Sequence, residues 1–208
     1  MTRGGWRIIK TKMEEIVQLN SNAKLSEHFV LGEFTKSGSH PEVYNIPSHE
    51  AIANLKRLCI WLEELRKRYN DKYVVVKGDS STTLGMTSPS LSSRPSTSSP
   101  SLSSRPSEAR GEISEEPIRL NSGYRSPQLN RAIGGAANSN HLTGCACDKR
   151  VSGMEQILRY AVILMDYADE TKQDFDELLL ERSPKGNYWL HFAVRAQGNR
   201  RKINFLKA

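Results

Sequence analysis

The chain has 208 residues, of which 37% are hydrophobic, and its formal net charge is +7. This length fits one domain of ordinary size with an additional linker, and no segment approaches the length of an apolar transmembrane helix. The positive charge favours anionic partners, such as nucleic acid, anionic lipid or an acidic envelope polymer, without choosing among them.

Residues 1–24 are expected to be a partly disordered amino-terminal extension, followed by a single domain over residues 25–208. The first twenty residues are polar and contain no apolar core of a secretory signal peptide. We therefore expect synthesis in the cytoplasm, without a signal peptide. Action at the cell wall or in the periplasm would then follow release by phage lysis or by an unidentified route.

A helix is predicted to begin after Ser48, which is a favourable N-cap residue. Apolar residues recur there at spacings of three and four and form one stripe, namely Ala51, Ile52, Leu55, Leu58, Cys59, Leu62 and Leu65. The following segment, residues 72–77, contains Tyr-Val-Val-Val and predicts a short strand.

A serine- and proline-rich insert interrupts the domain at about residues 78–116. The sequence S-P-S-L-S-S-R-P-S occurs in it twice, at 88–96 and 99–107. Such a tract cannot bury enough apolar surface to offset its ordering entropy, so we predict disorder. A tether or lid is one interpretation. A tolerated expansion of a surface loop is favoured, because loop-closure entropy grows slowly with length.

Further elements are predicted after the insert. Residues 117–121 read as a strand, and a short helix follows with Ser126 as N-cap and Pro127 at its first position. An amphipathic helix after Ser152 is expected to bury Met154, Ile157, Leu158, Ala161, Val162 and Met165. Strands at 175–182 and 187–195 form a hairpin. The predicted fold is α+β, a small antiparallel sheet with helices packed on one side.

The most unusual residues cluster at 138–148. His141 and Asp148 are seven positions apart and can converge if the chain turns at Gly144, and His191 on the last strand is a second candidate histidine. Two imidazoles and one carboxylate suit a single Zn²⁺, and three protein ligands leave a fourth position for water, as in a catalytic site. Each histidine alone would more often be an ordinary side chain.

The three cysteines do not indicate a disulfide framework, because their number is odd. The Cys145-Ala-Cys147 spacing is too short for the usual zinc pair. A bridge between alternate strand residues would be strained. We interpret Cys145 and Cys147 as free thiols.

Four stretches carry a family resemblance: S-E-H-F-V-L-G-E-F at 26–34, N-S-G-Y-R-S-P-Q-L-N at 121–130, G-G-A-A-N-S-N-H-L-T-G-C-A-C-D at 134–148 and Y-W-L-H at 188–191. In these stretches the chain resembles the zinc D-alanyl-D-alanine carboxypeptidase family, specifically its short bacterial and phage branch. The resemblance extends over residues 25–194 without the insert. It implies the zinc-site fold that this family shares with lysostaphin-type endopeptidases and the hedgehog signalling domain.

The resemblance implies that His141, Asp148 and His191 bind one Zn²⁺, the same residues that the spacing suggests. Arg125 matches a family arginine that steadies the substrate carbonyl or carboxylate near the metal. Three further residues are expected to contact substrate or shape its pocket, namely Ser122, Tyr124 and Ser139.

The general base departs from the family pattern. Many relatives carry an acidic residue three positions before the last histidine, where this chain has Tyr188. The short branch of the family instead carries its acidic residue at the end of the preceding strand. By this resemblance, Glu181 is the candidate catalytic base. Strand alternation puts Glu177 on the same face as Glu181 and Asp176 on the other.

The function that the resemblance implies is a zinc metallopeptidase acting on peptidoglycan stem peptides. The bond is left open, between a D,D-carboxypeptidase, an endopeptidase and a phage endolysin. The alternative is a catalytically inactive, zinc-stabilised module that binds the cell wall. A basic tail around Arg200 also suggests nucleic acid, but no aromatic platform accompanies it, so no nucleic-acid partner is expected. We expect a monomer.

Overall fold

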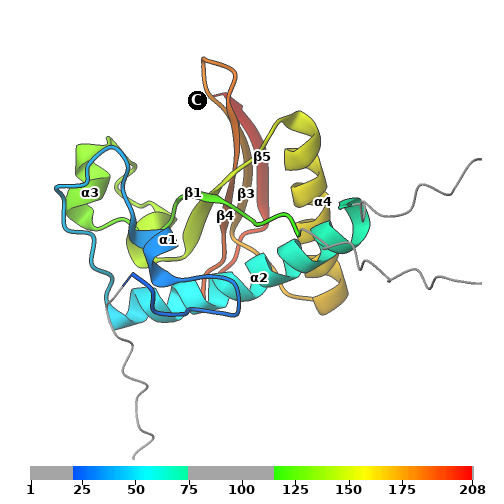
Figure 1. The fold of residues 1–208 in the computed structure, drawn as a ribbon, viewed down its shortest axis with the longest axis horizontal. Coiled ribbons are helices and arrows are strands. Elements are labelled where there is room, and N and C mark those ends of the chain that lie inside the picture. Colours follow the sequence, from blue (N-terminus) through cyan, green and yellow to red (C-terminus); the bar gives the residue numbers. More distant parts are fainter. Residues whose placement is uncertain (1–20, 75–114, 208) are drawn as a thin grey trace, which may run out of the picture.

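The computed structural model describes residues 21–74 and 115–207 (Figure 1). The predicted disorder of residues 1–20 and of most of the serine- and proline-rich insert lies outside these residues. The described elements are, in chain order, α1 (Leu31–Thr35), α2 (His49–Tyr73), β1 (Leu120–Ser122), α3 (Pro127–Ala132), the 3₁₀ helix η1 (Asn140–Thr143), β2 (Ala146–Arg150), α4 (Met154–Thr171), β3 (Glu177–Arg182), β4 (Tyr188–Ala193) and β5 (Lys202–Lys207). The predicted α+β class is confirmed.

The strands form one five-stranded sheet in the order β1-β2-β4-β3-β5. The first four pair antiparallel, as expected, whereas β5 pairs parallel to β3 and makes the sheet mixed. This last strand was not predicted. Its position follows from the register: Glu177 at the start of β3 lies beside both Ala193, where β4 ends, and Lys202, where β5 begins. A short connection therefore returns the chain along the free edge of β3.

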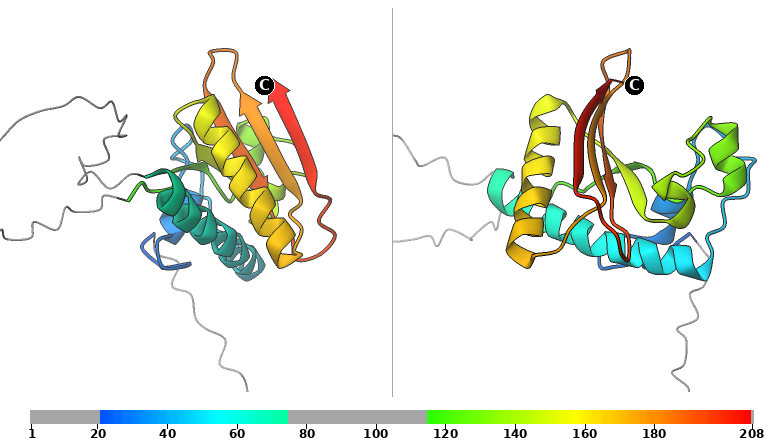
Figure 2. Two further views of the ribbon diagram at one scale, coloured as in Figure 1. Left: turned by 90° about the vertical axis from the view of Figure 1, so that its right-hand side faces the viewer. Right: turned by 180° about the vertical axis from the view of Figure 1, so that it is seen from behind.

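The two long helices and one face of the sheet enclose the hydrophobic core. α4 covers this face beside α2, whereas α1 and α3 lie on the other side of the sheet (Figures 1 and 2). Trp61 of α2 packs against Phe192 of β4 and Phe175, with ring centroids 5.4 and 6.4 Å apart. Along β4, Leu190 and Phe192 are fully buried in the core. Strand alternation therefore turns Trp189 and His191 towards the opposite face.

The predicted helix starts are confirmed by their caps. The Ser48 hydroxyl accepts a hydrogen bond from the backbone N–H of Ala51, and Ser126 accepts one from that of Leu129. The predicted strand at 72–77 is wrong where it can be compared, because α2 continues through Tyr73. The Tyr73 ring is held there by Tyr69 at 5.5 Å and by the guanidinium of Arg159 at 4.2 Å. Residues 75–77 lie outside the described part.

The predicted core face of α4 is partly wrong. Ile157 and Ala161 are buried, but Met154, Leu158 and Val162 are 37%, 48% and 41% exposed. The other buried side chains of this helix are Gln156, Tyr160, Ile163, Leu164 and Ala168. The buried stripe is therefore rotated away from the side that apolar spacing alone selected, because a polar Gln and a Tyr take core positions.

None of the helices in residues 21–74 and 115–207 combines the length and the hydrophobicity that crossing a bilayer requires.

Candidate metal centre

His141, Asp148 and His191 converge on the sheet face that is turned away from α4. His141 lies on η1, and the chain then turns at Gly144, which has a φ of +72°. A Cβ atom at this position would lie 2.6 Å from the backbone oxygen of Ala51, so both the backbone angle and the available space require glycine. The turn leads into β2, where Asp148 lies directly opposite His191 of β4. The predicted convergence at Gly144 is therefore confirmed.

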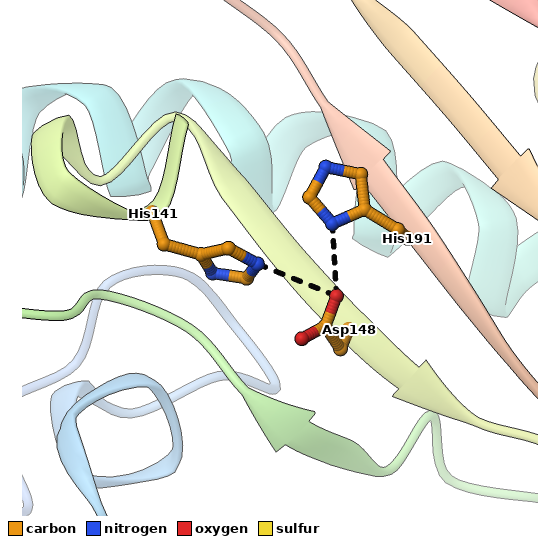
Figure 3. A group of neighbouring side chains, drawn as sticks. All are labelled: His141, Asp148 and His191. Atoms are coloured by element: carbon orange, nitrogen blue, oxygen red, sulfur yellow. Dashed lines mark hydrogen bonds and ion pairs between the residues drawn. The ribbon is translucent and has the colours of Figure 1, made fainter. Parts of the chain in front are cut away.

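The three side chains point towards one another (Figure 3). Oδ1 of Asp148 lies 2.9 Å from Nδ1 of His191 and 3.3 Å from Nε2 of His141. One donor atom from each residue falls within 4.8 Å of the other two. All three residues are at least 92% buried, with exposed fractions of 2%, 8% and 7% in chain order.

The imidazoles are oriented by their second nitrogens. Nδ1 of His141 lies 2.5 Å from the backbone oxygen of Gly123, so this nitrogen donates and leaves Nε2 facing Asp148. Burial by itself would lower the pKa of His191, but the hydrogen bond with Asp148 and the nearby Glu177 carboxylate raise it to about 9. Burial would likewise raise the pKa of Asp148, but the two histidines outweigh it and lower that pKa.

These residues fit a Zn²⁺ ion. Two imidazoles and one carboxylate are its common donors, and three protein ligands leave an open position. The Asp148 carboxylate lies 2.9 Å from Nδ1 of His191 and 3.3 Å from Nε2 of His141, so these two nitrogens face the carboxylate. A cation placed between the three side chains would offset the cost of burying the carboxylate.

Arg125 reaches the same cluster from the loop after β1. Its Nη2 donates to Oδ2 of Asp148 at 2.8 Å, and its Nε donates to the hydroxyl of Ser122 at 2.9 Å. Ser122 therefore orients the guanidinium. Tyr124, in contrast, lies in the hydrophobic core and is only 7% exposed, so the structure does not bring it to the cavity.

A cavity of about 550 Å³ adjoins the cluster, and Glu181, Arg125 and Ser139 are among its lining residues. Burial raises the pKa of Glu181, and the negative charge of Asp148 raises it further. Ser139 also accepts a hydrogen bond from the backbone N–H of His141 at 3.3 Å, so it caps η1.

Glu177 is a part of the site to which sequence reasoning gave no role. Its Oε2 lies 3.6 Å from Nε2 of His191 and accepts a hydrogen bond from Asn140 at 3.0 Å. Arg200 and Lys202 pair with its other oxygen at 2.9 and 3.2 Å. Contact with His191 is the main cause that lowers the pKa of Glu177, so its carboxylate is ionised. The alternation that placed Glu177 beside Glu181 was the available signal.

Asp176 anchors the same end of the sheet. Its side chain is fully buried and pairs with Arg200 at 2.8 Å and Arg195 at 2.9 Å. Asn140 donates to Asp176 at 2.7 Å and also to Glu177. Although alternation predicts Asp176 and Glu177 on opposite faces, both carboxylates accept a hydrogen bond from the Asn140 side chain.

Residues 96–168 match the family model for peptidase M15. In this segment the chain is similar to the M15 peptidases. The matched segment contains Arg125, His141 and Asp148, and it ends before β3 and β4, which carry Glu181 and His191. No curated protein matches the chain. M15 peptidases are zinc-dependent, in agreement with the donor set of the cluster.

Proposed function

We propose that this chain is a zinc metallopeptidase that hydrolyses a D-amino-acid-containing peptide bond in peptidoglycan stem peptides. The observation that carries the proposal is the buried His141, Asp148 and His191 cluster, whose donor atoms lie within 4.8 Å of one another beside a cavity. The M15 match supports metallopeptidase chemistry.

His141, Asp148 and His191 would hold the ion. Bound Zn²⁺ supplies a Lewis acid that polarises the scissile carbonyl and makes an attacking water more acidic. Glu177 contacts the second nitrogen of His191, and Gly123 contacts that of His141, so both imidazoles are fixed in orientation. Such outer partners set the direction and basicity of a metal ligand.

Glu181 acts as the general base. It accepts a proton from the water whose oxygen attacks the carbonyl carbon, and it delivers that proton to the leaving amine as the carbon–nitrogen bond breaks. Its raised pKa makes the carboxylate a stronger base for the first step, and the protonated carboxyl then donates in the second.

Arg125 stabilises the carbonyl oxygen as that oxygen becomes negative. Its guanidinium borders the cavity and is held by Ser122, so little reorganisation is needed during the reaction. Ser139, at the rim of the same cavity, supplies a hydroxyl for the substrate backbone.

The competing hypothesis is a wall-binding module that has lost its base. The observation behind this hypothesis is Tyr188, which occupies the position where many relatives have an acidic residue. Tyr188 packs beside the hydrophobic core and stacks under Arg182 at 5.5 Å, whereas Glu181 of the neighbouring strand lines the cavity. This arrangement favours the catalytic hypothesis.

The basic tail favours a structural role over nucleic-acid binding. Arg195 and Arg200 both pair with Asp176, and Arg201 pairs with Asp169 and Asp174. Their charges are therefore compensated within the domain. We propose peptidoglycan stem peptides as the partner, and the cell wall as the place of action.

The test is mass spectrometry of a synthetic stem pentapeptide and of purified peptidoglycan after incubation with the zinc-loaded protein. A chelator-treated sample and the Glu181→Gln variant are compared with Glu27→Gln, a matched change at an exposed position. Zinc-dependent release of D-alanine identifies a carboxypeptidase, and split cross-links or stems identify an endopeptidase. Absence of any zinc-dependent product from both substrates would contradict the enzyme and favour the wall-binding module.

A further inference from the structure

A second cavity, of about 730 Å³, lies next to the candidate active site. It is lined by the start of β1, the end of β2, the beginning of α4 and the start of β4. Trp189 borders both this cavity and the one that contains Glu181 and the metal cluster. A peptide bound at the metal centre can therefore extend past Trp189 into the second cavity.

The sheet register relates the second cavity to the metal centre. Arg150 of β2 pairs with Trp189 of β4, just as Asp148 pairs with His191. Residues paired across strands share a face, so Arg150 lies on the same face as the cluster. It is two residues along β2 from Asp148, or about 6.6 Å. That is about the length of two residues of an extended peptide substrate.

Two arginines give this cavity its charge. Arg150 and Arg119 both line it, and the backbone N–H of Arg150 donates to the oxygen of Arg119 at 2.9 Å, which keeps them side by side. Among the described residues, neither guanidinium has an ion pair or a side-chain hydrogen bond, although most arginines elsewhere near the site are paired. Glu116 also lines the cavity and accepts a hydrogen bond from Gln156 at 2.8 Å, so its charge offsets one arginine and the lining keeps a net positive charge.

We propose that Arg150 and Arg119, beside Trp189, form a subsite for a carboxylate of the peptide substrate, about two residues from the scissile bond. The proposal rests on the proposed peptidase function and adds to it a preference for acidic stems. A guanidinium binds a carboxylate through two parallel hydrogen bonds, which a carboxamide cannot reproduce with the same charge. The uncapped start of α4 at Gly153, in the wall of the same cavity, adds positive partial charge.

The experiment compares two synthetic stem pentapeptides that differ only in one group, a free carboxylate or a carboxamide about two residues from the scissile bond. For the zinc-loaded full chain we expect kcat/KM to be about tenfold higher with the carboxylate. Arg150→Gln is expected to lower kcat/KM about tenfold for the carboxylate peptide and less than about twofold for the carboxamide. Arg119→Gln should act in the same direction, and Arg150→Lys should retain part of the preference.

Arg131→Gln, an exposed arginine at the end of α3, is the matched control and should leave both values unchanged. Equal kcat/KM for the two peptides in the unmodified protein, or an equal loss for both in Arg150→Gln, would overturn the subsite. If neither peptide is cleaved, the proposed function fails instead. Calorimetric titration of both peptides into chelator-treated protein then still tests the subsite, because binding needs no turnover. A carboxylate preference that disappears in Arg150→Gln supports it, and equal affinities reject it.

Discussion

Asp148 and His191 are cross-strand partners on β2 and β4, and Oδ1 of Asp148 lies 2.9 Å from Nδ1 of His191. The pairing of two backbone strands thus brings together residues that are 43 positions apart in sequence. Because the two strands belong to a hydrogen-bonded sheet with a packed core behind it, this distance is fixed before any ion arrives. The site is therefore preorganised for metal.

The three candidate ligands are expected to be individually required for zinc. His141→Ala, Asp148→Asn and His191→Ala should each lose stoichiometric zinc, because three protein donors are the minimum for such a site. Metal content after dialysis, measured by mass spectrometry, checks this. His28→Ala, which removes a histidine that pairs with Glu63 elsewhere on the surface, is the control. Full zinc occupancy in His191→Ala would show that the ion is held differently.

Glu177 is expected to act on the metal through His191. Glu177→Gln should weaken zinc binding about 10- to 100-fold, as for other partners of metal-bound histidines. Competition with a chromophoric chelator measures the affinity, and circular dichroism establishes that the variant is folded. Glu27→Gln provides the comparison. An unchanged affinity in folded Glu177→Gln would reduce Glu177 to a member of the ion-pair network with Arg200 and Lys202.

Glu181 is expected to set the acidic limb of the pH–rate profile. Only its ionised form accepts the proton, so activity should fall as the pH drops through its pKa. Burial and Asp148 raise that pKa, so the fall should occur above the range of an ordinary glutamate, near 4.3. Rates measured between pH 4 and pH 8 test this. Glu181→Gln should lower kcat about 10²- to 10⁴-fold with zinc retained. A folded, zinc-bound variant with normal kcat would remove Glu181 from the mechanism.

Asp176 is expected to stabilise the fold around the site. Its buried carboxylate pairs with two partly exposed arginines, and removing its charge leaves both guanidiniums without that partner. Asp176→Asn should therefore lower the urea midpoint at pH 7, whereas Asp166→Asn, at an exposed position, should not. Burial alone would raise the pKa of Asp176, but its hydrogen bonds and ion pairs lower this pKa. The stabilisation is thus present above the unfolded pKa, near 3.9, and lost as the pH falls through the lower folded value. A difference from wild type that persists at pH 2 would argue against an ionic origin.

The cysteines are expected to be unreactive in the folded protein. Cys59, Cys145 and Cys147 are free and buried, and burial raises the pKa of Cys147 to about 11. Little thiolate is then present at pH 8, and reagents cannot reach it. Ellman titration should detect almost no thiol in native protein and three after denaturation. Rapid native reaction of Cys147 would mean that β2 opens readily.

The sequence by itself determined the helix caps and indicated which residues form the candidate metal cluster. Ser48 and Ser126 cap their helices as predicted, because a cap depends on neighbouring residues. Residue type and the glycine turn indicate His141, Asp148 and His191, and the family resemblance implies the same three.

Only the tertiary structure decided which residues surround the cluster. The contact between Glu177 and His191, the pairing of Arg200 with Asp176, and the position of Arg150 beside Trp189 all depend on strand order and register. The parallel addition of β5 brings Lys202 to Glu177, and no periodicity along the chain encodes that contact. Hydrophobic spacing likewise selected Leu158 for the core, whereas the packing of α4 on the sheet left it exposed. Spacing reports which residues share a face, but the choice of the face that is buried depends on all the elements packed against it.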